Sequence, residues 1–251
     1  MRTMLPLLLS VAFASPAFGE ELKVYAAAAV KVPLLEMAAE YEAATGHTVT
    51  CVFDTAGATA KRFYGDPAAA LLITTEALIG EGDKTGRLKG GTTYPLADTV
   101  GGFAAPPGAV KPDISTPEKL KAALLSARRI AFSDPARGAP VGTHFMTVIE
   151  SLGIKDAVLQ KATLAPDGVE TMRLVLEGKV DLGVTQLSEV VQANPGALVG
   201  PFPAQFDLAT TFSLWHAPTI SAAARTFVTL VTGPAGRAKL TKDGLRPPAG
   251  R

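Results

Sequence analysis

The side chains that most often carry out acid–base, metal or nucleophilic chemistry lie scattered along this sequence of 251 residues. Its three histidines, His47, His144 and His216, are far apart and lack metal-ligand spacing. Its single cysteine, Cys51, lies in the alternating stretch TVTCVF, which is typical of a strand, so we expect it in the core. The sequence has no Gly-rich phosphate loop, no G-x-S-x-G motif and no C-x-x-C pair. We therefore expect neither a metal nor a cofactor.

A more specific signal is a stretch that has no reactive side chain. The segment VYAAAAVKVPLL, residues 24–35, places four alanines between a strand-like and a helix-like segment. Small side chains leave the backbone N–H groups at a helix N-terminus accessible, and such groups bind anions. We therefore predict Ala28 and Ala29 as ligand-binding residues. The alternative is that these alanines only let the strand and the helix pack closely.

Other ends of strand-like segments, near residues 54–58, 75, 133–143 and 185–188, could contribute to the same site. Threonine hydroxyls and the glutamine amide can donate hydrogen bonds, and glycine lets a ligand approach the backbone. Each candidate has a plain alternative as a helix cap, an N-terminal turn or a solvent-facing amide. The candidates are Thr55, Ala56, Thr75, Val141, Gly142, Thr143 and Gln186.

Three ionisable residues lie close to these segments. Lys61 and Arg62 follow the second junction by about one helical turn, and we interpret them as a solvated helix face. His144 lies beside the predicted cleft and could exchange a proton near neutral pH. It is our candidate base if the protein is an enzyme. Otherwise it is a packed surface histidine, and the site has no catalytic residue.

The elements that must position these residues alternate between strands and helices, which indicates an α/β fold with helices on both faces of parallel sheets. Two local interpretations can be tested. The S-x-x-E pattern at Ser115 and Glu118 predicts a capping box at the start of a helix, and residues 80–91 are rich in turn formers. Strands are predicted at 22–26, 47–53, 68–74, 129–133 and 179–185, and helices at 33–46, 57–64, 115–127, 142–153, 169–178 and from 220 onward.

Residues 1–19 combine a basic residue, an apolar stretch and small residues near Gly19, which is the pattern of a secretory signal peptide. Cleavage near Gly19 and cleavage after Ala14 both fit this pattern. The chain has 24 Lys and Arg against 23 Asp and Glu, so it lacks the excess of positive charge that attracts nucleic acid. Export without disulfides favours a bacterial periplasmic location.

Five motifs, in this order, resemble the periplasmic molybdate-binding proteins, which are solute receptors of ABC importers with the type II periplasmic-binding fold. The family pattern is a strand, AAASL and a helix, then ETGV, SGALA, ADP-x-x-x-PAG and G-x-ADAGFVY. This chain has YAAAAV at 25–30, AATGHTV at 43–49, TAGATAK at 55–61, SDPARGAPVG at 133–142 and EGKVDLGVTQLSE at 177–189. The likeness covers nearly all of the chain after the signal peptide.

The departures from this family pattern fall on its ligand contacts. Ala29 and Ala56 stand where the family has serines, Gln186 stands for its tyrosine, and Ala70 stands for an acid. Each missing charge-assisted hydrogen bond would cost about 1.5–3 kcal/mol. The resemblance therefore implies the family's scaffold with a ligand other than molybdate, and we favour a small organic carboxylate.

The resemblance implies a two-lobed type II periplasmic-binding fold with mixed sheets and two hinge crossovers. We expect lobe one to comprise residues 20–98 and 207–251, and lobe two residues 99–206. The ligand would lie between the lobes, and Phe212 and Trp215 would belong to the crossover strands. The expected function is that of a monomeric periplasmic receptor that delivers an anion to an ABC permease. The alternatives are an isomerase of an unsaturated tricarboxylate, similar to aconitate isomerase, and a ligand sensor for a membrane kinase.

Overall fold

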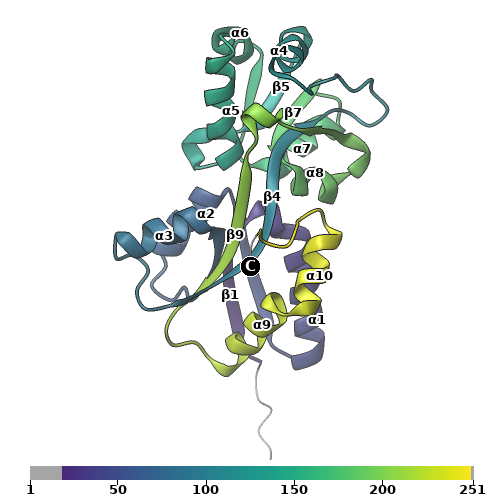
Figure 1. Cartoon of the computed structure of the whole chain (residues 1–251). Helices are drawn as coiled ribbons and strands as arrows, with labels where there is room; N and C mark the ends of the chain where they lie inside the picture. Colours follow the sequence, from purple (N-terminus) through teal and green to yellow (C-terminus); the bar gives the residue numbers. More distant parts are fainter. Residues whose placement is uncertain (1–18, 250–251) are drawn as a thin grey trace, which may run out of the picture.

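The chain folds into two α/β lobes that are joined by two long strands (Figure 1). The computed structural model describes residues 19–249, so the predicted signal peptide lies outside the described residues except for Gly19. We call the lower body in Figure 1 lobe one and the upper body lobe two. None of the helices within residues 19–249 is long and apolar enough to cross a membrane.

Lobe one is built on parallel strands covered by helices. Strand β1 pairs in parallel with β2 on one side and with β3 on the other, so the carboxyl ends of all three strands point toward lobe two (Figure 1). Its elements are β1 (Glu21–Ala27), η1 (Ala28–Val30), α1 (Lys31–Thr45), β2 (Thr48–Asp54), α2 (Ala56–Tyr64), β3 (Leu71–Thr75), α3 (Glu76–Lys84), α9 (Ala222–Thr232) and α10 (Pro234–Lys242).

Lobe two repeats this plan. Strand β5 pairs in parallel with β6 and β7. Its elements are α4 (Pro117–Ser126), β5 (Ile130–Ser133), η2 (Pro135–Arg137), α5 (Pro140–Ser151), α6 (Lys155–Leu159), β6 (Ala162–Ala165), α7 (Gly168–Leu176), β7 (Leu182–Gln186), α8 (Leu187–Ala193), η3 (Pro195–Ala197), β8 (Leu198–Pro201) and η4 (Ala204–Phe206).

Strands β4 (Thr92–Ala104) and β9 (Ala209–His216) connect the two lobes. They pair antiparallel with each other, while β9 also pairs with β3 in lobe one and β4 with β7 and β8 in lobe two. The strand order is therefore β2-β1-β3-β9-β4-β7-β5-β6, with β8 beside β4. Phe212 and Trp215 lie on β9, as predicted for a crossover strand.

Each lobe has its own hydrophobic core. In lobe one, Leu34, Met37, Ala38 and Tyr41 form the buried face of α1, as their spacing predicts. In lobe two, the buried rings of four phenylalanines meet edge to face, which is a favoured aromatic geometry. These rings belong to Phe103, Phe132, Phe145 and Phe202. Because each lobe packs around its own buried apolar residues, it can keep its shape while the segments between the lobes bend.

Two sequence interpretations are wrong in detail. Thr116, and not Ser115, caps α4, because its hydroxyl accepts a hydrogen bond from the Lys119 N–H at 3.3 Å. The turn-rich segment from residue 80 begins inside a helix, since α3 extends to Lys84. Gly82 lowers helix propensity, but a Cβ there would come within 2.6 Å of the Tyr64 hydroxyl, so close packing requires the glycine.

Candidate functional site

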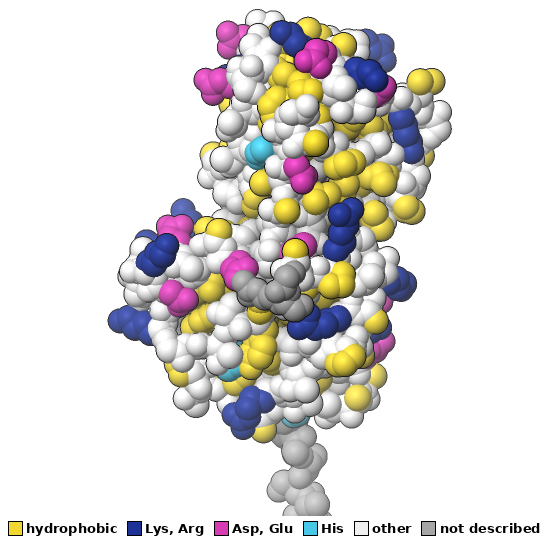
Figure 2. Space-filling model, in the orientation of Figure 1, with side chains coloured by type: hydrophobic (Ala, Val, Ile, Leu, Met, Phe, Trp, Pro, Cys, Tyr) yellow, Lys and Arg dark blue, Asp and Glu magenta, His cyan; other side chains and the backbone are white. Residues whose placement is uncertain are grey.

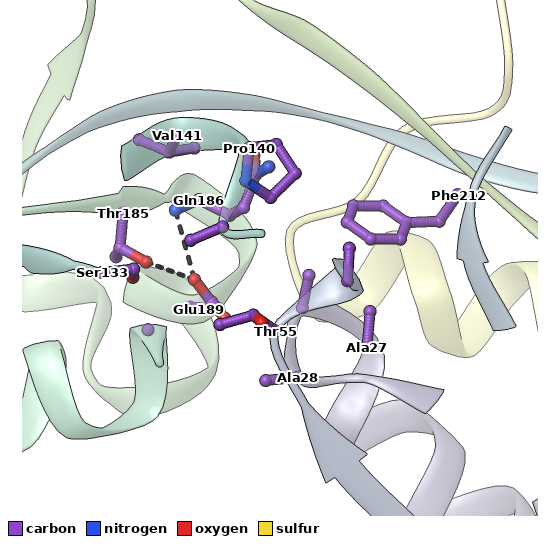
Figure 3. A pocket seen from close by; sticks show the side chains of 14 residues that line it. Ala27, Ala28, Thr55, Ser133, Pro140, Val141, Thr185, Gln186, Glu189 and Phe212 are labelled. Carbon is purple, nitrogen blue, oxygen red and sulfur yellow. Dashed lines mark hydrogen bonds between the residues drawn. The ribbon is translucent and has the colours of Figure 1, made fainter. Parts of the chain in front are cut away.

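A small cavity of about 30 Å³ lies between the two lobes (Figure 3). Its walls come from the ends of strands and from the helix starts that follow them. A water molecule needs roughly 10–15 Å³, so the cavity in this arrangement has room for little more than water. The lining residues are Ala27, Ala28, Ala29, Thr55, Ala56, Ser133, Ala139, Pro140, Val141, Gly168, Thr185, Gln186, Glu189 and Phe212.

Helix starts dominate this lining because each follows the carboxyl end of a parallel strand. The turn η1 leads from β1 into α1, and its N-cap residue, Ala27, makes no side-chain capping bond. Helix α5 likewise starts after Ala139 without a side-chain cap, with Pro140 at the first position. Backbone N–H groups at such helix starts lack intrahelical partners and carry partial positive charge. The cavity wall is therefore suited to an anionic oxygen.

The carboxyl group of Glu189 also lines the cavity (Figure 3). Its side chain comes from the first turn of α8, and the residue is only 8% exposed. Oε2 accepts hydrogen bonds from the Thr185 hydroxyl and, at 3.2 Å, from the Gln186 N–H. Burial raises the pKa of Glu189 to about 7, the two hydrogen bonds oppose this rise, and the nearby Asp167 adds to it. A carboxyl group that titrates near neutral pH therefore faces the cavity.

Gln186 contributes a second polar group to the cavity wall. The residue is 4% exposed, and its Nε2 donates to the Thr210 hydroxyl at 3.3 Å. Its carbonyl oxygen, Oε1, is buried and has no hydrogen-bond partner within the described residues. Buried polar atoms normally have a partner, so this oxygen is a candidate ligand contact. Within residues 19–249, no group of three His, Cys, Asp or Glu side chains could hold a metal ion.

One set of charged and backbone groups bridges the lobes. The guanidinium of Arg137 in lobe two donates to both carboxylate oxygens of Asp54 in lobe one, at 2.7 and 2.8 Å. Arg62 also contacts Asp54 at 2.8 Å, so it is not only part of a solvated helix face. The Gly57 N–H donates to the Gly138 carbonyl at 3.0 Å. We call these contacts the Asp54 bridge.

The amide of Gln192 also joins the lobes. Its Nε2 donates to the Ala29 carbonyl at 2.8 Å, and its Oε1 accepts from the Val32 N–H at 3.2 Å. We call these two contacts the Gln192 bridge. Together the two bridges hold the lobes in a closed arrangement around the small cavity.

A larger cavity of about 450 Å³ adjoins the small one and shares Ala28 and Glu189 with it. Most of its wall is apolar, and its charged residues are the cations Lys31 and Arg173 and the acids Glu177 and Glu189. Arg173 is ion-paired with Glu170 and Glu177. Figure 2 shows hydrophobic side chains gathered over α7 and α8 of lobe two. The lining residues are Ala28, Lys31, Val32, Val169, Met172, Arg173, Leu176, Glu177, Glu189, Gln192 and Ala193. We call it the outer cavity, and its size is in the range of small-molecule sites.

The structure brings most of the predicted site residues together. Ala28, Ala29, Thr55, Ala56, Val141 and Gln186 all line the small cavity. The other candidates do not belong to its lining.

Thr75 caps α3, accepting from the Leu78 N–H, and Thr143 is exposed on α5. Gly142 packs against β5, where a Cβ would come within 1.9 Å of the Ser133 carbonyl oxygen. His144 lies near the Phe206 carbonyl oxygen, with its Nε2 at 2.7 Å, and not among the lining residues.

Glu189 is the ionisable residue of the cavity lining, and sequence reasoning missed it. Its signal is present, because a Glu three residues after Gln186 has the spacing of a capping box, and its carboxylate accepts from the Gln186 N–H at 3.2 Å. A capping box normally has a purely local role, so this pattern does not by itself indicate a cavity-facing acid.

Comparison with known proteins agrees with the architecture. Residues 22–246 match the model of a family described as bacterial extracellular solute-binding protein. The chain is 27% identical over 184 residues to an aconitate isomerase from a Pseudomonas species, covering 71% of this chain and 68% of that protein. It is 25% identical over 199 residues to the molybdate-binding protein ModA of Escherichia coli K12, covering 78% of this chain and 77% of that protein.

A solved structure has the same fold. The periplasmic molybdate-binding protein of Azotobacter vinelandii aligns with a TM-score of 0.73 and 20% identity, over 90% of this chain and 99% of that one. The predicted two-lobed type II periplasmic-binding fold and the resemblance to molybdate-binding proteins are thus confirmed. The chain belongs to the family of bacterial extracellular solute-binding proteins.

Proposed function

We propose that this protein is a periplasmic receptor that binds a small organic carboxylate between its lobes and delivers it to an ABC permease. The observation that carries the proposal is the interlobe cavity at which the uncapped starts of η1 and α5 meet. Backbone N–H groups at these helix starts would receive a carboxylate. The likeness to ModA and the family of solute-binding proteins support the role in transport.

Two features favour a carboxylate over molybdate. First, Ala29 and Ala56 bring no hydroxyl to the cavity, so a compact oxyanion would lack side-chain donors at these positions. Each missing charge-assisted bond is worth about 1.5–3 kcal/mol. Second, the outer cavity adds apolar surface together with the ammonium group of Lys31. A carbon skeleton with a second carboxylate would use that space, whereas a tetrahedral oxyanion would not.

We expect di- or tricarboxylates to raise the melting temperature of the protein and molybdate to leave it unchanged. Binding stabilises the folded state by RT ln(1 + [L]/Kd), which is about 2.7 kcal/mol at a hundredfold excess over Kd. A thermal-shift screen followed by titration calorimetry measures both classes of ligand. Sub-micromolar affinity for molybdate, with no response to carboxylates, would contradict the proposal.

A second candidate function is isomerisation of an unsaturated tricarboxylate. It is favoured by the carboxyl group of Glu189 inside the cavity and by the 27% identity to an aconitate isomerase. In such a reaction, Glu189 would take a proton from a methylene carbon, the double bond would shift to that carbon, and the same proton would return to the other end of the allylic system. Glu189 fits this role better than His144, which does not line the cavity.

Incubation with trans-aconitate tests this second candidate. If the protein is an isomerase, wild type converts trans-aconitate to cis-aconitate, which chromatography detects. Glu189→Gln should lower the rate by about 10²–10⁴-fold, the usual contribution of a general base, while His144→Ala should retain most of it. No conversion above the buffer blank would exclude the isomerase. A loss of rate in His144→Ala but not in Glu189→Gln would identify His144 as the base.

A further inference from the structure

We infer that Glu189 and Gln186 make the interlobe site select an anion that carries its own hydrogen-bond donor, namely a hydroxycarboxylate. This inference rests on the proposed function, because it names the subclass of carboxylate that the receptor would take. The geometry behind it is the presence of two buried acceptor groups in a cavity that is otherwise suited to an anion.

The first acceptor is the carboxylate of Glu189. Its Oε2 already accepts from the Thr185 hydroxyl and the Gln186 N–H, and both donors come from its own lobe. The second acceptor is the buried Oε1 of Gln186, which has no partner within the described residues. Both residues are more than nine-tenths buried and line the same cavity. A ligand in this cavity therefore meets acceptors on this wall.

The charged groups around Glu189 do not change this conclusion. Asp167, the N-cap residue of α7, is a further acid near Glu189 and raises the pKa of Glu189. The guanidinium of Arg137 is held by Asp54 in the Asp54 bridge. Lys31, Arg173 and Glu177 line the outer cavity and not the small one. The cavity itself thus has no basic side chain among its lining residues to offset Glu189.

An anion without a donor would place its oxygens against two acceptors. Like charges and unpaired buried acceptors both oppose binding, so sulfate, molybdate and plain dicarboxylates are disfavoured at alkaline pH. A hydroxycarboxylate avoids this conflict, since its carboxylate faces the helix starts while its hydroxyl donates to Glu189 or Gln186. The acceptor pair therefore acts on specificity as well as on affinity.

The experiment compares matched anions at pH 8 by thermal shift and titration calorimetry. Malate and succinate differ by one hydroxyl group, and hydrogenphosphate and sulfate are tetrahedral dianions of which only hydrogenphosphate carries a hydroxyl donor. We expect wild type to bind malate at least about tenfold more tightly than succinate. In Glu189→Gln the amide can donate a hydrogen bond, so succinate should gain affinity and the preference should shrink. Glu150→Gln, an exposed position on α5, is the matched control and should behave as wild type.

Four outcomes separate the inference from the proposed function. If wild type prefers malate over succinate and Glu189→Gln loses this preference, the result supports both the inference and the proposed function. Equal binding of malate and succinate, or tight binding of sulfate, overturns the inference and leaves an anion receptor. Selectivity for hydrogenphosphate over sulfate, without binding of malate, supports the requirement for a hydrogen-bond donor on the anion. It overturns the proposal that the ligand is a carboxylate. If none of the four anions binds, the proposed receptor and the inference both fail.

Discussion

Replacing Gly57 with valine should weaken carboxylate binding by about 10- to 100-fold. Gly57 lies in the first turn of α2, where its N–H joins the Asp54 bridge. A Cβ at this position would come within 2.7 Å of the Gly138 Cα and 3.1 Å of its carbonyl oxygen. These atoms belong to the backbone of the other lobe, so they can make room only if the lobes separate. Overpacking of this kind costs about 1–3 kcal/mol, which here opposes closure.

Calorimetry with the carboxylate that gives the largest thermal shift measures this effect. Gly57→Ala should show a smaller loss than Gly57→Val, because only its Cβ enters the contact. The control is Gly80→Val on α3, where a Cβ would meet no atom within 4 Å. Unchanged affinity in Gly57→Val would mean that ligand binding does not need this closed arrangement.

Glu189→Gln should remove a large part of the pH dependence of stability. Because the pKa of Glu189 is about 7 in the folded protein and its ordinary value is 4.5, the unfolded chain releases this proton more readily. The sign follows from linkage: the stabilisation is fully present below pH 4.5 and is lost as the pH rises through 7. At about 1.4 kcal/mol per pKa unit, the loss in wild type amounts to about 3 kcal/mol.

Urea denaturation of both proteins at pH 5 and pH 8 measures the difference. Burial also raises the pKa of Asp243, but that group is common to both proteins, so its effect cancels in the comparison. The wild-type free energy of unfolding should fall relative to that of Glu189→Gln between the two pH values. A constant difference between the proteins would show that Glu189 keeps an ordinary pKa in the folded state.

Local sequence patterns predicted the elements that depend on neighbouring residues. The face of α1 and strands such as β1 and β5 follow from hydrophobic spacing and burial. Strand β4 was not predicted, because its alternation is broken by Pro95 and its pairing with β9 joins distant parts of the chain. Tertiary pairing of this kind leaves only a weak local pattern.

The same distinction holds for the candidate site. Ala28, Ala29, Thr55 and Ala56 were identified because the carboxyl ends of parallel strands meet at one edge of a sheet. Their roles in binding stay predictions. The contact between Asp54 and Arg137 joins residues 83 positions apart, and no local pattern specifies it. The sequence could therefore predict the location of the cleft but not the contacts that close it.

The Asp54 bridge and the Gln192 bridge both join the lobes and set the order of events in binding. The cavity of about 30 Å³ cannot admit a carboxylate while both bridges are intact. Entry must wait for the lobes to part, so the observed association rate would level off at the opening rate as ligand concentration rises. Weakening either bridge would therefore speed capture of the solute.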